Sequence, residues 1–268
     1  KIPSLKPVFD KNGTVTAADS VVNEIDFDIP KNALGKNETA ILNIMAANKW
    51  KRPIYFTMAY DDLGFQNYLR KDGMSYRLVP VAGSPVNTDW VYKLVMDPKK
   101  WGYGNANLPG VYFDEENRRH LNDIRKADLE LAYDLIFKDR KEDARKVLEK
   151  SDKMILEQNF AYGEASRNND HNRLSLAFLD ACYRADDQKL AAKVLASLKK
   201  DLQQQMRYYD ALTDLKADNM DYEKRNTANI LQQLEQLEKS EGPQKTLSPE
   251  TGIIGGDSNA LPNDSLKK

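Results

Sequence analysis

The chain has 268 residues, of which 41% are hydrophobic, so it is long enough to bury a substantial core as one large domain or two ordinary ones. Forty Lys and Arg stand against 41 Asp and Glu, and the formal charge of -1 offers no positive excess to attract a nucleic acid or an acidic lipid surface. The single cysteine, Cys182, excludes an intrachain disulfide and a thiolate-rich metal cluster. We expect no nucleic-acid partner and no cofactor.

Apolar runs are short throughout the sequence. The longest, such as residues 41–47, fall far below the roughly 20 residues that a helix needs to cross a bilayer, so no membrane span is expected. The chain begins at Lys1 with neither an initiator Met nor a signal-type apolar segment. We therefore expect a water-exposed segment of a longer polypeptide.

The first part of the chain mixes extended and helical signals. Residues 1–32 contain three prolines, with a turn signal at 10–13, and are expected to be extended. Apolar side chains at helical spacing predict a helix over 37–49, capped by Asn37 or Thr39. Strands are expected at 54–57 and 76–81, followed by a short helix capped by Thr88. This order predicts a small N-terminal mixed α/β subdomain over residues 1–115.

The composition becomes helical from residue 116 onward. Leucine and isoleucine side chains keep one helical face at the start, and nearly everything up to 239 follows a helical pattern. Residues 144–148 are echoed by 191–195, each group after a polar turn, which indicates a TPR-like array (tetratricopeptide-like helix hairpins). Two plain antiparallel helix pairs explain the echo equally well, because residues 154–172 interrupt any strict period. The Gly-, Ser- and Pro-rich residues 240–268 predict a flexible tail.

Motifs for catalysis are weak in this sequence. His120 and His171 stand in no metal-ligand spacing, and each is expected to be solvated or to cap a helix. Carboxylate groups at 61–62, 114–116 and 186–187 leave open a soluble glycoside hydrolase, although turns and helix caps account for them better. Cys182 is expected in the core of a helix pair. No nucleophile elbow or phosphate-binding glycine motif is present.

Aromatic residues gather in the first third of the chain. Rings stack well on the apolar faces of sugars, so this group is a candidate lining for a sugar-binding groove, but aromatics at strand positions more often form core. The group consists of Trp50, Tyr55, Phe56, Tyr68 and Tyr76.

Three sequence blocks occur in an order that resembles a known family. They lie at residues 41–56, 68–81 and 111–119, and are followed by the helical region. In this order they resemble the C-terminal region of the DUF2723 family, polytopic membrane proteins related to the protein O-mannosyltransferase TMEM260 and classed with GT-C membrane glycosyltransferases.

This resemblance implies a division of labour within a longer protein. The membrane part of such enzymes carries the acidic catalytic residue and the site for the lipid-linked sugar donor. The present chain would be an extracytoplasmic, periplasmic C-terminal domain with no catalytic residue of its own. Its expected partners are the membrane-embedded part of the same polypeptide and an acceptor protein or glycan. The candidates for surface or ligand contacts are Trp50, Arg52, Tyr55, Tyr76, Arg77 and Arg118.

Two other functions remain open at this point. A free-standing TPR-like scaffold would bind a peptide on the concave face of the helices. A soluble glycoside hydrolase would use one of the carboxylate groups. The α+β fold class, with a helical array after the N-terminal subdomain, is common to all three hypotheses.

Overall fold

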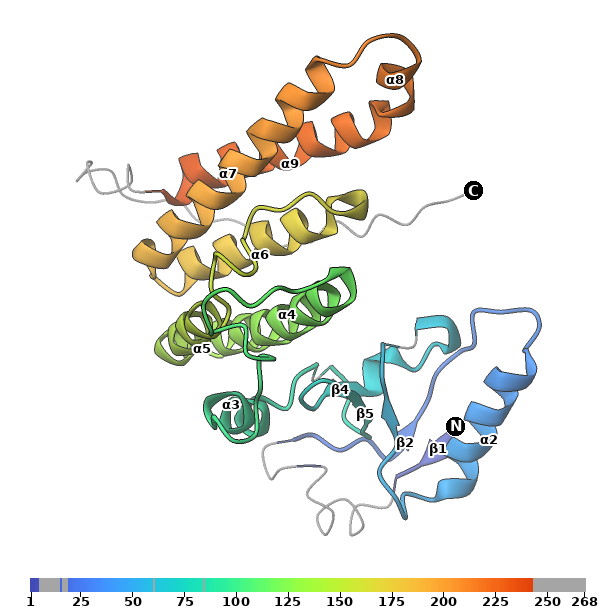
Figure 1. Ribbon diagram of the computed structural model, residues 1–268. Coiled ribbons are helices and arrows are strands. Elements are labelled where there is room, and N and C mark those ends of the chain that lie inside the picture. Colours follow the sequence, from blue (N-terminus) through green and yellow to red (C-terminus); the bar gives the residue numbers. More distant parts are fainter. Residues whose placement is uncertain (5–14, 16–18, 60, 84, 243–268) are drawn as a thin grey trace, which may run out of the picture.

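The N-terminal unit, residues up to Val81, is built on two small antiparallel sheets. A computed structural model describes residues 1–4, 15, 19–59, 61–83 and 85–242 (Figure 1). In the first sheet β1 (Ile2–Pro3) pairs with β2 (Glu24–Ile25). The second sheet has the strand order β3 (Tyr55–Phe56), β5 (Tyr76–Leu78), β4 (Leu69–Lys71). A small hydrophobic core lies between the sheets and α2 and includes Ile25, Met45, Leu63, Phe65 and Val79.

Helix α2 (Lys36–Asn48) begins slightly before its predicted position. Neither Asn37 nor Thr39 caps it: Gly35 is the N-cap residue, and its backbone N–H donates to Glu38 Oε2 at 2.7 Å. Because the Thr39 hydroxyl donates back to the Gly35 carbonyl at 3.0 Å, it supports the first turn from inside the helix. The helix ends as Lys49 and the residue after it take left-handed backbone angles, with φ of 47° and 57°.

The predicted strands are present but shorter than expected, and one strand was missed. Residues 69–71, for which the sequence predicts no strand, form β4 and pair with β5 in the register Leu69–Leu78, Arg70–Arg77, Lys71–Tyr76. Two 3-10 turns, η1 (Asp61–Leu63) and η2 (Gln66–Tyr68), connect β3 to β4. The strand was missed because its two cationic residues are typical of an exposed turn, whereas all three of its residues are buried.

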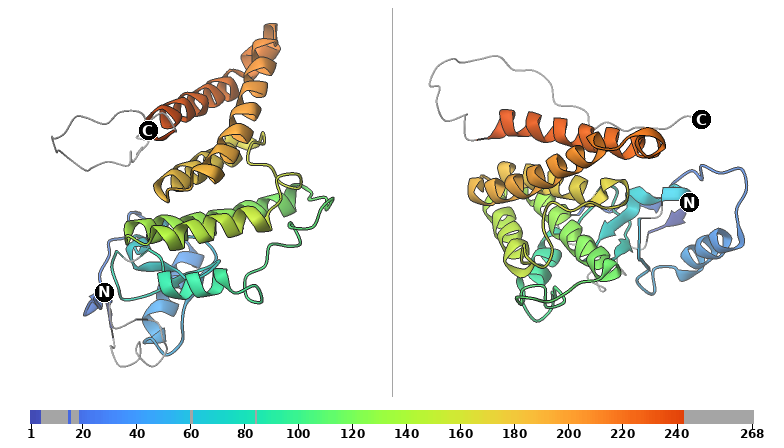
Figure 2. Two further views of the ribbon diagram at one scale, coloured as in Figure 1. Left: turned by 90° about the vertical axis from the view of Figure 1, so that its left-hand side faces the viewer. Right: turned by 45° about the horizontal axis from the view of Figure 1, so that its top comes forward.

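The helical array occupies the rest of the described chain (Figures 1 and 2). It contains α3 (Thr88–Met96), α4 (Glu115–Phe137), α5 (Lys141–Met154), α6 (Asp170–Arg184), α7 (Gln188–Asp210), α8 (Asp214–Asn219) and α9 (Asp221–Glu241). Helix α4 packs on α5 and on α6, α6 packs on α7, and α9 packs on α7 and α6. The prediction of an α+β fold with a helical C-terminal region is confirmed, and the two expected helix hairpins are α4–α5 and α6–α7.

The array has its own hydrophobic core, which is separate from that of the N-terminal unit. It begins at Val86 and takes in Trp101, Tyr103 and Phe113, so residues 86–113 pack with the helices that follow them. The predicted domain boundary at residue 115 stays a prediction. The two hydrophobic cores are separated earlier in the chain, between Val81 and Val86. On α4 the predicted apolar face is buried at Leu121, Leu131 and Leu135.

The segment between α5 and α6 is an ordered part of the array. Its backbone is held at Leu156, whose N–H donates to the Ala106 carbonyl at 3.1 Å, and its rings Phe160 and Tyr162 are buried. The short turn η3 (Arg167–Asn169) leads into α6. At Gly163 a Cβ atom would lie 2.4 Å from the Ser197 carbonyl of α7, so only glycine fits there.

Two predictions lie outside the described residues, namely the turn at 10–13 and the tail from 243 onward. Within the residues described, no helix has both the length and the apolar character required to cross a membrane.

Candidate functional site

Three of the six predicted contact residues meet on the three-stranded sheet. Tyr55 and Arg77 are cross-strand partners, and the guanidinium carbon of Arg77 lies 5.5 Å from the centre of the Tyr55 ring. The Tyr55 hydroxyl donates to Asp72 Oδ2 at 3.1 Å, and Arg77 Nη1 lies 3.5 Å from the same oxygen. Tyr76 precedes Arg77 on β5 and pairs across the sheet with Phe56 and Lys71, and Lys71 Nζ lies 4.5 Å from the centre of its ring. We call Tyr55, Lys71, Asp72, Tyr76 and Arg77 the sheet cluster.

Buried cations of this sheet are each matched by a carboxylate. Lys71 Nζ lies 3.0 Å from Glu130 Oε2 on α4, which ties the N-terminal unit to the helical array. Arg70 forms an ion pair with Asp19. Because removing a charge from water is costly unless a partner is supplied, this pairing indicates a structural role for the cations of the sheet. Tyr55 is the outermost member of the cluster, with 47% of its surface exposed.

The other three predicted contact residues lie elsewhere. Trp50 is a buried core side chain, and its indole N–H donates to the Pro3 carbonyl at 2.7 Å. Arg52 is exposed beyond α2, where its backbone N–H donates to Asn48 Oδ1 at 3.3 Å. Arg118 lies on α4 in the array. Of the aromatic group, Phe56, Tyr68 and Tyr76 pack against the core of the N-terminal unit.

A groove of about 910 Å³ opens at the N-terminal ends of α4 and α6. Arg118 sits in its wall, where it pairs with Glu164 and donates through Nε to the Phe113 carbonyl at 2.9 Å. Tyr112, with 82% of its surface exposed, stands at its edge. The lining combines aromatic rings with both signs of charge: Tyr112, Phe113, Glu115, Glu116, Arg118, Arg119, Asn122, Phe160, Glu164, Ala165, Ser166, Arg167, Asp170 and His171.

The inner wall of the groove corrects the expectation for His171. This histidine is only 2% exposed, and its Nε2 lies 2.8 Å from the Ala161 carbonyl. Its ring meets Phe160 edge-on at 4.8 Å, and Arg125 lies over the same phenylalanine ring, also at 4.8 Å. Burial, with the positive charge of Arg125 adding to it, lowers the pKa of His171 to about 4. The expectation of a solvated or capping side chain was wrong because the packing of the 155–169 segment encloses the ring.

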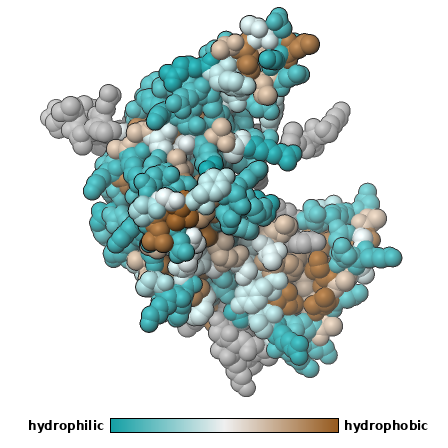
Figure 3. Space-filling model, in the orientation of Figure 1, coloured by the Kyte–Doolittle hydropathy of each residue, from teal (hydrophilic) through white to brown (hydrophobic). Residues whose placement is uncertain are grey.

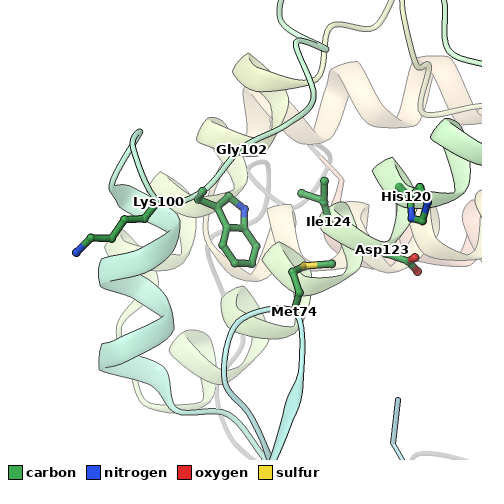
Figure 4. A pocket seen from close by; sticks show the side chains of 7 residues that line it. Met74, Lys100, Gly102, His120, Asp123 and Ile124 are labelled. Atoms are coloured by element: carbon green, nitrogen blue, oxygen red, sulfur yellow. The ribbon is translucent and has the colours of Figure 1, made fainter. Parts of the chain in front are cut away.

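A smaller hollow of about 350 Å³ lies on another side of the α4 N-terminal half (Figure 4). The turn between β4 and β5 contributes Met74, which points toward Ile124 of α4, while His120 and Asp123 stand at one end. The hollow is lined by Met74, Lys100, Trp101, Gly102, His120, Asp123 and Ile124. We call it the α4 hollow. It joins residues from the N-terminal unit and from the array, which sequence patterns along one helix do not reveal.

The predicted carboxylate groups are occupied in structural contacts. Asp114 accepts from the Asn117 N–H at 2.9 Å and caps α4, and Asp187 accepts from the Leu190 N–H at 3.0 Å and caps α7. Asp186 Oδ2 lies 3.1 Å from Lys141 Nζ, and Asp62 Oδ2 lies 3.1 Å from Lys31 Nζ. The two caps correspond to a role that the sequence favoured, whereas Asp186 and Asp62 form surface ion pairs.

The remaining candidate catalytic residues, Cys182 and His120, are respectively buried in the core and exposed to solvent. Cys182 is fully buried, as predicted, and burial raises the pKa of its thiol. His120 is 62% exposed, which confirms a solvated side chain, and its Nε2 lies 3.6 Å from Glu116 Oε1. Among the described residues no cluster of three or more His, Cys, Asp or Glu side chains is suited to a metal ion.

One buried carboxyl group was not singled out from the sequence. Asp128 lies on the inner side of α4, and Tyr103 donates its hydroxyl to Asp128 Oδ2 at 3.0 Å. Burial raises the pKa of Asp128 to about 7, although the hydrogen bond from Tyr103 acts against that rise. The sequence gives little sign of this burial. Asp128 stands one helical turn after the apolar Ile124, and its buried partners come from distant segments.

The fold defines the class of protein: a small α+β unit of short antiparallel strands joined to a helical array. Within it, residues 4–93 match the family model described as TMEM260-associated domain 2. The predicted resemblance to TMEM260-like proteins is confirmed over this range, which contains the sheet cluster and the first part of α3 but neither the groove nor the third sequence block at 111–119. No curated protein and no solved structure matches the chain.

Proposed function

We propose that this chain is a water-exposed domain of a TMEM260-like membrane protein that positions an acceptor or partner for glycosyl transfer and does not itself make or break bonds. In this proposal it stands on the extracytoplasmic, periplasmic side as the C-terminal part of a glycosyltransferase of the DUF2723 kind. The match over residues 4–93 supports the kind of parent protein. The groove at the ends of α4 and α6 is the observation that carries the positioning role.

The groove has the size and chemistry of a surface that holds a polypeptide segment. Its volume of about 910 Å³ is at the upper end of the range for small-molecule pockets. Its ionic groups include pairs such as Arg118–Glu164 and Arg119–Glu116, so both donors and acceptors are available to an incoming chain. The exposed ring of Tyr112 adds a rigid contact of the kind enriched at binding sites.

The helix packing supports the same surface under the scaffold hypothesis. Two adjacent hairpins, with α4 packed on α6, follow the stacking order of a TPR-like array. The two hypotheses differ in the effect of binding in the groove. In a domain of a membrane enzyme, binding changes glycosyl transfer by the membrane part, whereas a free-standing scaffold has no such effect. We favour the membrane enzyme because the N-terminal unit is similar to a TMEM260-associated domain.

Transfer kinetics in membranes that carry the full-length protein test this proposal. The variant Tyr112→Ala with Arg118→Ala is compared with Phe137→Ala, which removes a ring that is 88% exposed at the other end of α4. If the groove positions the acceptor, the groove variant raises the acceptor KM about tenfold and leaves kcat unchanged. Equal acceptor KM values in the groove variant and the control would contradict the proposal, and a loss of kcat alone would place the groove in the chemical step.

A further inference from the structure

The α4 hollow has apolar walls and a carboxylate at one end. The indole of Trp101, the thioether of Met74 and the side chain of Ile124 line it. Asp123 stands at the end with His120, whereas Lys100 extends away from the space that these residues enclose (Figure 4). The Lys100 ammonium is directed to Asp97 instead, with Nζ 3.6 Å from Asp97 Oδ2. The wall residues come from three separate segments, so the hollow depends on the folded arrangement of both units.

Asp123 is the carboxylate that stands at one end of the hollow. It is exposed and forms no ion pair within the part of the chain that the structure describes. Its neighbour at the same end, His120, already lies next to Glu116, at 3.6 Å. Glu116 in turn pairs with Arg119, so the carboxylate at this end of the hollow that no described cation pairs with is that of Asp123.

The indole wall is held in a fixed orientation. Trp101 is only 7% exposed, and its ring nitrogen is buried. A wall that is already ordered loses little conformational entropy when a ligand enters. Met74, by contrast, is 44% exposed on the turn between β4 and β5 and forms the outer side of the hollow.

We propose that the α4 hollow binds the cationic side chain of a lysine or arginine from a partner polypeptide. Such a side chain has an aliphatic stem that fits between apolar walls and a charged head that stays at the surface. The head would meet the Asp123 carboxylate, and the stem would lie along Trp101 and Ile124, with an additional attraction between the cation and the indole face. A neutral apolar side chain satisfies the walls and leaves the carboxylate unused, whereas an acidic one is repelled.

This inference is carried by the hollow alone and does not require the groove to bind an acceptor. The two sites nevertheless adjoin, since Glu116 lines the groove and lies 3.6 Å from His120, which lines the hollow. A peptide in the groove with a basic residue at the right position would reach both. The selectivity of the hollow for a basic residue is the difference between its affinity for a basic side chain and its affinity for a neutral side chain of similar shape.

Binding of blocked amino acids to the whole chain tests the inference, with chemical shifts of the amides of α4 and of the 72–76 turn as the readout. The probes are the N-acetyl methylamides of lysine, arginine, norleucine and glutamate. We expect lysine and arginine to bind at least about tenfold more tightly than norleucine, with Kd values on the order of 1 mM, and glutamate not to bind. The variant Asp123→Asn should lower lysine and arginine binding to the norleucine value, since it keeps the shape and removes the charge.

Matched controls separate this result from a general effect of charge or of folding. Glu149 is an exposed carboxylate on α5, away from the residues that line the hollow, so Glu149→Gln should leave lysine binding unchanged. Met74→Ala should weaken all three binding probes together, because it removes part of the wall. Equal binding of norleucine and lysine, an Asp123→Asn variant that binds lysine as the native chain does, or no binding of lysine and arginine up to about 10 mM would each overturn the inference.

Discussion

The N-terminal unit and the start of α6 in the helical array bury their polar groups in different ways. In the N-terminal unit the buried polar side chains are cations, Arg70, Lys71 and Arg77, each with a carboxylate partner. The start of α6 is fixed mainly by amide and hydroxyl groups: Asn169 donates to Gln205 Oε1 at 3.0 Å and to Thr227 Oγ1 at 2.8 Å, and Gln205 donates to Asp201 Oδ2 at 2.6 Å.

This difference separates two ways of specifying a fold. Neutral hydrogen bonds that are fully satisfied fix the alignment of helices without the cost of removing charges from water. Buried ion pairs incur that cost, and they tolerate loss of a partner poorly. The part of the chain similar to TMEM260-associated domain 2 is largely the ion-paired unit, whereas the groove lies on the array. The N-terminal unit contacts the array through the Lys71–Glu130 ion pair, and the groove that we propose as the binding surface lies on the array.

Separate cores predict that a core substitution acts within its own unit. Phe178 in α6 is fully buried and packs 5.3 Å from Tyr162, so Phe178→Ala should lower the free energy of unfolding of the array by about 3–5 kcal/mol. Phe65→Ala should weaken the N-terminal unit by a similar amount and leave amide hydrogen exchange in α6 unchanged. Equal loss of protection in α2 and α6 upon Phe65→Ala would show that the two units unfold as one.

The buried histidine predicts an acid-dependent weakening that is confined to the array. Since the pKa of His171 falls to about 4 in the folded chain, the unfolded chain binds the proton first, and the stability that the neutral ring contributes is lost as pH falls from about 6.5 through 4. The stability difference between the native chain and His171→Gln should therefore shrink by about 3 kcal/mol between pH 7.5 and pH 4. Comparing the two chains cancels the contribution of Asp128.

The Asp128 carboxyl group changes the stability of the chain with pH in the direction opposite to His171. Because its pKa is raised to about 7, the stability associated with its protonated form is fully present below pH 3.8 and is lost as pH rises through 7. The absolute pH profile of the native chain mixes both groups. Urea unfolding of both chains at each pH provides the measurement, and a stability difference that stays constant with pH would contradict the buried, neutral state of His171.

The ion pair between the two units predicts a smaller effect. Lys71→Met removes the ammonium group that faces Glu130 and should cost about 1–2 kcal/mol, less than a fully buried pair because 29% of the Glu130 side chain is exposed. Lys146→Met breaks an exposed pair with Asp143, at 3.3 Å within α5, and should change stability by no more than about 0.5 kcal/mol. Thermal unfolding of both variants tests this, and equal effects would show that the docking contact carries no special weight.

The smallest effect separates the two members of one carboxylate pair. Asp187→Ala removes the buried cap of α7 and should cost about 1 kcal/mol. Asp186→Ala removes an exposed partner of Lys141 and should be close to neutral. Helix content and unfolding midpoints of the two variants check the prediction. A larger loss at Asp186 would mean that the exposed carboxylate does more than pair with a surface lysine.

Long periodic segments could be predicted from the sequence, and contacts between distant segments could not. The apolar face of α4 at Leu121, Leu131 and Leu135 follows a 3.6-residue repeat, so both its helical state and its buried side were readable. Strand β4 has only three residues, two of them cationic, and its burial depends on carboxylates from elsewhere, Asp19 and Glu130. No local pattern supplies that information.

The candidate site was predictable only in part for the same reason. Arg118 was predicted as a contact residue and does line the groove, and Tyr55 and Arg77 do come together across the sheet. The enclosure of His171, however, is produced by Phe160 and by Arg125, 46 positions before it in the chain. The α4 hollow needs Met74 and Trp101 to meet α4, which follows from the docking of the two units and not from any one motif.

Cross-linking during transfer tests the central claim most directly. A photoreactive phenylalanine analogue is placed at Tyr112, at the edge of the groove, or at the equally exposed Phe137, in the full-length protein in membranes that carry out transfer to a defined acceptor. We predict a covalent adduct with that acceptor from position 112 and none from position 137. Equal yields at the two positions, or no adduct from position 112 while transfer proceeds, would contradict a positioning role for the groove.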